Sequence, residues 1–360
     1  MEKNIRPKYG VVGVVGVPAN YGGFETLVDN LVSEHNDSMD EKSNKDFLVF
    51  CSSKAYEKKT DSYKNAKLVY VPLNANGIHS IFYDVLCLIM CIFYRPATIL
   101  VLGVSGAIFM PVLKLFYRGK VVTNIDGLEW RRAKWGRLAK RFLKFSECIA
   151  VKFSDVVISD NKAIADYVRS EYNKESLVIA YGGDHAVSQS NTNIDTKDFA
   201  FALCRIEPEN NVHLILESFS KTEVKLVFVG NWDSSEYGRM LKSKYSTFKN
   251  ITILDPIYDI YKLSVLRGEC RFYVHGHSAG GTNPSLVEMM HFAKPILCFD
   301  CDYNRATTEE QALYFRNVDS LIQIISECCF PEDIGEKMYE IATRRYQWSI
   351  VRQQYLDAMS

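Results

Sequence analysis

The sequence predicts an α/β protein with two lobes, each a doubly wound parallel sheet covered by helices. Segments with the β-branched composition of strands alternate with segments whose apolar residues recur at helical spacing. This alternation is typical of parallel sheets joined by crossover helices. It is interrupted by a polar stretch, residues 186–198, and then resumes. The length of 360 residues also suits two domains of roughly 100–200 residues each.

The order of the elements follows from this alternation. In the first lobe we expect strands at residues 9–15, 47–51, 67–71, 98–102, 120–124 and 155–159, and helices at 24–35, 78–94, 106–117 and 136–153. In the second lobe we expect strands at residues 199–205, 225–230, 251–254, 272–275 and 295–299, and helices at 211–220, 236–245, 285–292 and 319–327. We therefore assign residues 1–190 to an N-terminal domain, 191–335 to a C-terminal domain, and 336–360 to a helix that packs back on the first lobe.

Composition and charge narrow the class of protein. The 43 Lys and Arg residues balance 43 Asp and Glu residues, and 47% of the chain is apolar. These values exclude a disordered chain and argue against a general nucleic-acid binder. The ten cysteines are scattered, and the start of the chain has no signal-peptide pattern, so we expect a cytoplasmic protein with reduced thiols. The longest apolar run, residues 78–94, is too short for a spanning helix and predicts a buried helix, with a position near a membrane face as a further option.

A metal site is not expected. Cys298 and Cys301 form a single CxxC pair, whereas a structural zinc site needs a second pair of ligands. Two cysteines at the end of a core strand explain this spacing.

The first candidate ligand loop follows the first strand. It contains Asn20, Tyr21, Gly22 and Gly23 and leads into an amphipathic helix. Glycines allow positive φ angles and a close approach of a ligand to backbone N–H groups. The glycines do not form the GxGxxG pattern of a dinucleotide fold. A tight strand-to-helix turn is the alternative explanation.

The second candidate, residues 272–288, has the order strand, glycine-rich loop, helix. Pro284 suits the first helical position and Asn283 suits the cap. Backbone N–H groups at such a helix start could hold a diphosphate. Glu288, one turn into the helix, could accept ribose hydroxyls, although a carboxylate there also favours the helix dipole alone. The candidate donor-binding residues are Gly280, Gly281, Thr282, Asn283, Ser285 and Glu288. His275 and His277 lie two residues apart on a strand pattern, so at most one should face a ligand.

The third candidate lies after the strand at residues 120–124. Asp126, Glu129, Trp130 and Arg131 follow that strand closely, at the carboxyl edge where open α/β sheets place ligands. Tryptophan faces stack on sugar rings, and carboxylates bind hydroxyls or accept protons. A charged surface loop with one buried tryptophan is the alternative.

The charge is unevenly distributed around this third segment. Residues 118–152 contain ten Lys and Arg against three acids. Arg137, Lys140, Arg141 and Lys144 have the spacing of one helix face. A basic amphipathic helix suits lipid headgroups or a lipid-linked substrate, and a solvated helix face is the simpler alternative. The fourth candidate is Arg205, at the end of the first strand of the second lobe, where a guanidinium could bind phosphate.

Together these segments resemble the bacterial family-4 retaining glycosyltransferases, and most closely the rhamnosyltransferase-like subgroup. The resemblance rests on VPANYGGFETLVDNLV, NIDGLEWRRAKWG, HGHSAGGTNPSLVEMM and RIEPENN. It implies the GT-B fold, with two Rossmann-like lobes facing a cleft. The N-terminal lobe would lie on the acceptor side and the C-terminal lobe would bind the nucleotide-sugar. Two positions depart from the family pattern, since Asn210 stands where the family has lysine and Gly280 where it has glutamate.

The resemblance also implies a reaction. The enzyme would transfer a sugar to a glycan or to a polyprenyl-diphosphate-linked acceptor, with retention of configuration and without a metal or cofactor. The subgroup implies that this sugar is rhamnose and that the donor is dTDP-rhamnose. The reaction would belong to surface polysaccharide synthesis at the inner face of the plasma membrane. The donor would be dTDP- or UDP-linked. Arg205 would bind the donor phosphates and Glu288 the ribose. We expect Asp126, Arg205 and His277 to be catalytic, Gly22 and Gly23 to approach the donor, and Asn20, Tyr21, Glu129, Trp130 and Arg131 to bind the acceptor. His275, His277 or Asp126 could replace the missing glutamate.

Three other classes remain open on the sequence. A sugar-nucleotide 2-epimerase of the same fold would leave the tryptophan-rich segment and the basic helix without a role. A nicotinamide dehydrogenase would be expected to carry GxGxxG. A non-catalytic membrane-surface scaffold would be consistent with Asn210 and Gly280.

Overall fold

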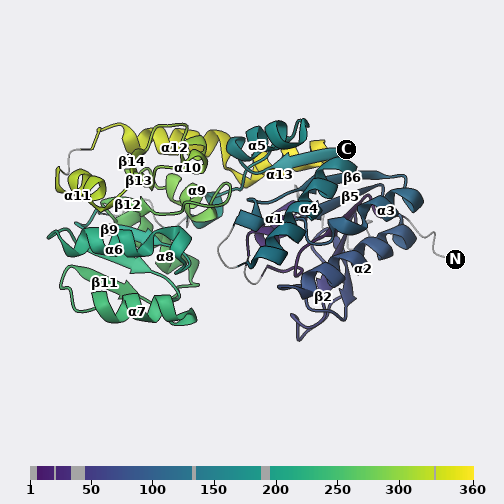
Figure 1. Ribbon diagram of the computed structural model, residues 1–360, viewed down its shortest axis with the longest axis horizontal. Coiled ribbons are helices and arrows are strands. Elements are labelled where there is room, and N and C mark those ends of the chain that lie inside the picture. The colour runs from purple at the N-terminus through teal and green to yellow at the C-terminus, as the bar shows by residue number, and fades with distance from the viewer. Residues whose placement is uncertain (1–5, 20–21, 34–44, 132–134, 188–194, 328–329) are drawn as a thin grey trace. The chain divides into compact units, whose positions relative to one another are not determined.

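The computed structural model describes residues 6–19, 22–33, 45–131, 135–187, 195–327 and 330–360 (Figure 1). The chain divides into two compact units. Unit 1 comprises residues 1–160, 164–179 and 352–360, and unit 2 comprises residues 161–163 and 180–351. The last nine residues of the chain therefore belong to unit 1. The division after residue 179 precedes the polar stretch at 186–198, of which residues 188–194 lie outside the described part.

Unit 1 is built on an eight-stranded sheet in the part of the chain that the structure describes, with the order β3-β4-β2-β1-β5-β6-β7-β8. The strands are β1 (Tyr9–Val12), β2 (Phe47–Ser52), β3 (Ser62–Tyr63), β4 (Ala66–Val71), β5 (Thr98–Leu102), β6 (Lys120–Asn124), β7 (Val156–Ser159) and β8 (Leu177–Val178). Only the edge pair β3–β4 is antiparallel among these pairings. The central strands are apolar and buried along their length, as expected when helices cover both faces.

The helices of unit 1 are α1 (Gly23–Leu31), α2 (His79–Tyr94), α3 (Met110–Phe116), α4 (Arg137–Phe153) and α5 (Lys162–Tyr172). The end of α13 (Trp348–Met359) completes this unit. Thr98 Oγ donates a hydrogen bond to the carbonyl of Met359 at 2.8 Å, and Arg352 donates to the carbonyl of Leu31 at 3.2 Å. These bonds attach the C-terminal segment to β5 and α1, two elements from the first third of the chain.

Unit 2 is built on a six-stranded parallel sheet within the described residues, with the order β11-β10-β9-β12-β13-β14. Its strands are β9 (Ala200–Leu203), β10 (Leu226–Val229), β11 (Ile251–Leu254), β12 (Phe272–His275), β13 (Ile296–Phe299) and β14 (Leu313–Phe315). Its helices are α6 (Val212–Ser220), α7 (Glu236–Tyr245), α8 (Ile260–Glu269), α9 (Pro284–Met290), α10 (Asp302–Thr307), α11 (Val318–Glu327) and α12 (Ile334–Arg345). Two apolar clusters fill the two faces of this sheet. The predicted parallel α/β architecture of both lobes is confirmed.

The sequence patterns missed α5, α8 and the short helix α10. In α8 the fully buried residues are Ser264, Arg267 and Gly268, whereas Leu263 and Leu266 pack against the core only partly buried. This mixed face gives no clear apolar stripe for a periodicity search to detect.

Helix α2 differs from its prediction. One side is buried through Tyr83, Cys87, Leu88 and Cys91, but Ile78, Phe82 and Phe93 are exposed. The prediction of a buried helix is therefore right for only one of its faces. None of the helices in the described residues is long and apolar enough to cross a membrane.

Candidate functional site

The candidate site in unit 2 lies at the carboxyl edge of its sheet. Strands β9 and β12 pair in parallel, so Arg205, which follows β9, and the loop at residues 276–283, which follows β12, emerge at the same edge. Arg205 is exposed, and its guanidinium lies 3.8 Å from the carboxylate of Glu207. At that distance the ion pair is weak, and an anion of higher charge can compete for the guanidinium.

A buried polar pair holds the glycine-rich loop against the end of β9. His277 Nδ1 lies 2.6 Å from Asn210 Oδ1, and both side chains are buried. Asn210 Nδ2 donates to the carbonyl of Arg205 at 2.7 Å, which fixes the orientation of the amide. His277 Nδ1 therefore carries the hydrogen and donates it to Asn210. Asn211 Nδ2 donates to the carbonyl of Gly276 at 2.9 Å and adds a second bond between the two segments.

Gly280 adopts a backbone conformation that favours glycine, with φ of +124°. A Cβ atom at this position would lie 2.9 Å from Nε2 of His277. Position 280 is therefore closed to a larger side chain unless the imidazole moves. The imidazole of His277 therefore lies beside position 280, where the family that this sequence resembles has a glutamate.

Helix α9 begins as predicted. Asn283 is the cap, its Oδ1 accepts hydrogen bonds from Ser285 N at 3.0 Å and from Ser285 Oγ at 2.7 Å, and Pro284 is the first helical residue. Thr282 is buried, and its hydroxyl lies 3.4 Å from Asn161 Nδ2. The helix ends at Met290, so it spans only seven residues.

Glu288 lies between the guanidinium of Arg267 and the imidazole of His185. One carboxylate oxygen pairs with Arg267 of α8, and the other lies 3.4 Å from His185 Nε2. Burial opposes ionisation of Glu288, but the charge of Arg267 and the contact with His185 outweigh it and lower the pKa of Glu288. The carboxylate is therefore ionised and oriented. Arg267, buried at 3% exposure, belongs to the helix that the sequence analysis missed, so nothing in the apolar pattern pointed to this partner.

His275 has a different environment from His277. It is buried at the end of β12, and burial lowers its pKa to about 3. Its Nδ1 lies 3.5 Å from the hydroxyl of Tyr273, and Nε2 makes no hydrogen bond within the described residues. His275 is thus a neutral core histidine, and His277 is the one in contact with the glycine-rich loop.

In unit 1, two carboxylates of α1 support the loop that contains Gly22 and Gly23. Glu25 Oε1 accepts from the backbone N–H of Val15 at 2.9 Å, and Asp29 Oδ2 accepts from that of Ala19 at 2.9 Å. Burial raises the pKa of Glu25. A Cβ atom at Gly22, whose φ is +134°, would collide with the carboxylate of Glu25. Asn20 and Tyr21, the predicted acceptor contacts on this loop, lie outside the described residues.

Asp126 lies just beyond the carboxyl end of β6. Its φ is +63°, and its backbone N–H donates to Asn124 Oδ1 at 2.9 Å. Asn124 Nδ2 in turn donates to the hydroxyl of Tyr355 at 2.6 Å. The C-terminal helix therefore sets the position of the Asp126 turn.

Trp130 is anchored in an internal cluster. Its indole N–H donates to Glu147 Oε2 at 3.0 Å. The guanidinium of Arg131 lies 5.2 Å from the ring centroid, and the ammonium of Lys144 lies 4.9 Å from it. The hydroxyls of Tyr167 and Tyr172 donate to the same carboxylate, each at 2.6 Å. Glu129 accepts from Trp135 Nε1 at 3.0 Å.

The cluster also changes the interpretation of the basic face of α4. Lys144 is not directed to solvent with its neighbours, because it contacts Glu147, Glu171 and Tyr167. The exposed residues of α4 are Arg137, Leu138, Arg141, Phe145, Cys148 and Lys152. The prediction of one cationic face that includes Lys144 is therefore wrong, and the outward face mixes cations with apolar side chains.

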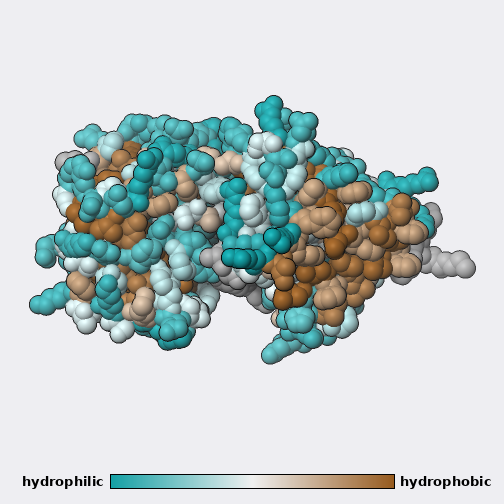
Figure 2. All heavy atoms as spheres, in the orientation of Figure 1, coloured by the Kyte–Doolittle hydropathy of each residue, from teal (hydrophilic) through white to brown (hydrophobic). Residues whose placement is uncertain are grey.

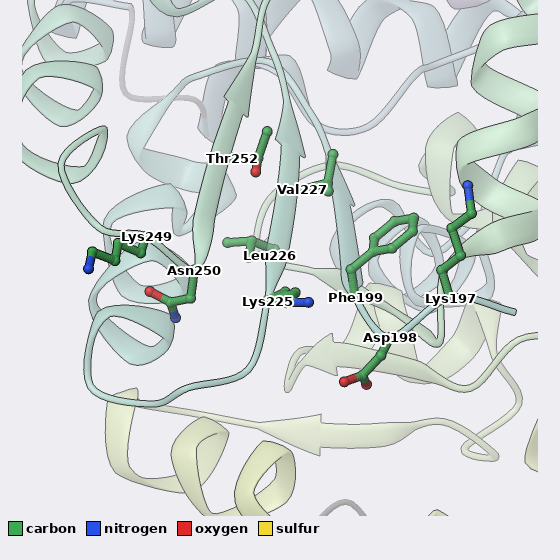
Figure 3. Close-up of a pocket in the computed structure, with 9 residues that line it drawn as sticks. All are labelled: Lys197, Asp198, Phe199, Lys225, Leu226, Val227, Lys249, Asn250 and Thr252. Carbon is green, nitrogen blue, oxygen red and sulfur yellow. The ribbon is translucent and has the colours of Figure 1, made fainter.

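A separate hollow in unit 2, of about 280 Å³, opens at the opposite edge of the sheet (Figure 3). It lies at the amino ends of β9, β10 and β11, beside Phe199, Leu226 and Asn250. None of its lining residues is a predicted site residue.

Metal ligands do not gather in the part of the chain that the structure describes. Among those residues no group of three or more His, Cys, Asp or Glu side chains could hold a metal ion. Cys298 and Cys301 are both free thiols.

The two parallel-sheet units have the fold of the GT-B glycosyltransferases. The structure is similar to sucrose-phosphate synthase from Thermosynechococcus elongatus, with a TM-score of 0.75, 14% identity and 98% of each chain covered. It is similar to HepE from Anabaena in complex with UDP, with a TM-score of 0.69, 13% identity and 99% of each chain covered. A glycosyltransferase from Rickettsia africae gives 0.68 and 12% identity, over 98% of this chain and 97% of that one.

Comparisons of the sequence cover less of the chain than the comparisons of structure. A family model described as a domain of unknown function, DUF1972, matches residues 7–184, which include most of unit 1. No curated protein matches the chain.

Proposed function

We propose that this protein transfers a sugar from a nucleotide-sugar donor to an acceptor hydroxyl. The observation that carries the proposal is the carboxyl edge of the unit 2 sheet. There, an exposed Arg205, a loop held by His277 and an ionised Glu288 occur together on a GT-B fold. The similar HepE structures contain UDP in one case and UDP-glucose in another.

Each of these groups has a role in the proposed reaction. Arg205 binds the donor diphosphate and stabilises the negative charge that grows as the glycosidic bond breaks. Glu288, held by Arg267 and His185, accepts hydrogen bonds from the ribose hydroxyls. His277 fixes the path of the backbone at Gly280, Gly281 and Thr282, whose N–H groups face the donor. Asn283 and Ser285 complete this donor-binding segment.

The groups of unit 1 serve the acceptor in this proposal. Asp126, held beyond β6 by Asn124, contacts the acceptor hydroxyl or the reacting sugar. Gly22 and Gly23 allow close approach to the donor phosphates. Glu129, Trp130 and Arg131 contribute to acceptor binding together with Asn20 and Tyr21. Since Trp130 is anchored by Glu147, its contribution is a fixed ring edge rather than a mobile stacking face.

The finer assignments are part of the same proposal. The donor is dTDP-rhamnose, transfer proceeds with retention and without a metal, and the acceptor is a glycan or a polyprenyl-diphosphate-linked glycan of a surface polysaccharide. This places the enzyme in the cytoplasm, at the inner face of the plasma membrane.

The first experiment identifies the donor. Purified protein is melted with a panel of dTDP-, UDP- and GDP-sugars, because a ligand that binds only the folded state raises the melting temperature. We expect one class of nucleotide to stabilise the protein by a few degrees, about the effect of 2–3 kcal/mol on a chain of this size. A panel without any stabilising nucleotide would contradict the proposal.

The second experiment tests the roles. With the stabilising donor and a polyprenyl-diphosphate-linked acceptor, Asp126→Asn and Arg205→Ala should each abolish transfer while the protein stays folded. Arg271→Ala is the matched control, since Arg271 precedes β12 at the opposite edge of the same sheet, where it pairs with Asp198 at 3.2 Å. Normal turnover in both site variants would exclude the assignment. Release of an altered nucleotide-sugar without acceptor would indicate an epimerase instead.

A further inference from the structure

A continuous apolar surface covers one side of unit 1. Ile78, the cap residue of α2, and Phe82 and Phe93 on the outward face of this helix are 68%, 64% and 78% exposed. These residues lie on one stripe of the helix, at spacings of four and eleven residues. The side chains between them on this stripe, Leu86 and Ile89, are also apolar and half-buried. A surface helix of a globular protein normally presents charged or polar residues on this face.

Two neighbouring helices extend the surface. Helix α3 contacts both α2 and α4. Leu115 and Phe116 at its end are 76% and 68% exposed, and Leu138 and Phe145 of α4 are 81% and 57% exposed. Figure 2 shows the resulting broad apolar area over α2 and α3. Apolar surfaces that large mark interaction sites rather than ordinary protein surface.

Cations accompany this apolar surface. Arg95 ends α2, Arg118 follows α3, and Arg141 and Lys152 alternate with Leu138 and Phe145 on the outward face of α4. Lys114, Arg118 and Lys120 also line a shallow hollow at the end of α3. One exposed acid, Asp155, lines the same hollow and pairs with Lys114. The acids carried by α2 and α4 themselves are buried. In residues 78–120 the only acid is Asp84, which is buried, and Glu147 of α4 is buried as well.

These two features together select one kind of partner. A protein partner that covers apolar residues needs no excess of one charge around them, because core interface positions are generally depleted of charge. A bilayer with anionic lipids offers acyl chains for the apolar side chains and phosphates for the cations within a few ångströms of each other. Arginine and lysine reach the headgroups while their aliphatic stems lie against the apolar layer.

We propose that the outward faces of α2, α3 and α4 form a membrane-docking surface that inserts apolar side chains into the interface of an anionic bilayer. This surface, rather than the basic residues of α4 alone, holds unit 1 on the membrane. The inference rests on the proposed location at the inner face of the plasma membrane and names the surface responsible for it. It can be tested apart from the transfer reaction, because the surface carries none of the proposed donor-binding residues.

The test is flotation of the full-length protein with vesicles. Vesicles of phosphatidylcholine with about one-third phosphatidylglycerol are compared with pure phosphatidylcholine, at about 0.05 M and about 0.5 M salt. We expect the protein to float with the anionic vesicles and to dissociate partly at high salt. The double variant F93S/L115S should lose binding by about tenfold or more per side chain. In the variant R118E/R141E, binding to anionic vesicles should fall by at least about fivefold for each cation replaced, and binding to pure phosphatidylcholine should not change.

The controls separate lipid binding from misfolding and from self-association. The variant Y258S/Y261S removes two exposed aromatic side chains of unit 2 (74% and 53% exposure) and should float like the wild type. Melting curves of all variants check that they are folded. The proposal is overturned if the wild type does not float at low salt, or if F93S/L115S floats like the control. It is also overturned if light scattering shows a dimer that F93S/L115S converts to a monomer without any binding of vesicles. If no nucleotide-sugar stabilises the protein in the melting experiment, the flotation result still stands on its own.

Discussion

Asn210 and Gly280 contact the same side chain, His277. The imidazole donates from Nδ1 to Asn210 Oδ1 at 2.6 Å, and Nε2 lies 2.9 Å from where a Cβ atom of residue 280 would be. Positions 210 and 280 are the two places where the sequence departs from the lysine and glutamate of the glycosyltransferase pattern. They lie 70 residues apart in the chain, yet they meet on one histidine. We conclude that the two departures form a single structural arrangement centred on His277.

The first prediction concerns this arrangement. His277→Ala should lower kcat/KM for transfer by about a hundredfold, the effect typical of losing one well-placed group at a developing charge. Asn210→Ala should cost about tenfold, because Asn210 acts by orienting the imidazole. The double variant should then be no worse than His277→Ala alone, since coupled residues are not additive. Steady-state kinetics of the three variants measure this coupling.

Ser278→Ala is the control for this cycle. Ser278 follows His277 in the glycine-rich loop, and its hydroxyl donates to the carbonyl of Glu209, in the turn after β9, at 2.7 Å. It should leave kcat/KM within about threefold of the wild type. Independent, additive losses for Asn210→Ala and His277→Ala would refute the coupling.

The second prediction separates the structural and binding roles of Glu288. Arg267→Met should destabilise the fold by about 3–5 kcal/mol, because it leaves a buried carboxylate without its partner. The double variant R267M/E288M should recover much of that stability, since apolar side chains of similar size can replace a buried ion pair. It should nevertheless lose the nucleotide-induced rise in melting temperature, because the ribose contact is gone. Thermal melting with and without the stabilising nucleotide measures both effects.

Glu288 also has a pH signature. Its pKa is lowered in the folded protein, so its contribution to stability is present above the unfolded pKa, near 4.5, and is lost as the pH falls through the lower folded pKa. The variant R267M/E288M should therefore lose less stability than the wild type between pH 5 and about pH 3. Equal acid sensitivity of the two proteins would argue against an ionised, paired Glu288.

The third prediction concerns Asp84 of α2. Burial raises its pKa from 3.8 to about 8. A folded-state pKa above the unfolded value means that the folded protein binds the proton more tightly, so the free energy of unfolding falls as the pH rises from about 4 to about 8. Asp84→Asn should remove this fall and make the protein more stable than the wild type at pH 8. Urea unfolding at pH 5 and pH 8 measures the difference.

Asp61→Asn, at an exposed position, is the control for Asp84. It should leave the pH dependence of the urea midpoint unchanged. If Asp84→Asn and the wild type lose stability equally between pH 5 and pH 8, Asp84 is not the titrating group.

The sequence predicted the central strands and most helices because their signals are local. A strand buried on both faces, such as β5, needs an unbroken apolar run, and α9 needs Asn283 and Pro284 at its start. These requirements fall on consecutive residues and can be found in the sequence. Helix α8 has no such signal, because Arg267 faces the interior toward Glu288 and breaks the apolar pattern.

The candidate site divides in the same way. The sequence by itself determined the two α/β lobes and the loops at their carboxyl edges, since the alternation of strands and helices and the positions of the loops follow from local patterns. Only the tertiary structure decided which side chains those loops contact. It placed His277 between Asn210 and Gly280, paired Glu288 with Arg267, and directed the apolar faces of α2 and α3 outward. The physical reason is that ion pairs, buried hydrogen bonds and exposure depend on residues far apart in the chain, whereas helix and strand periodicity depends on neighbours.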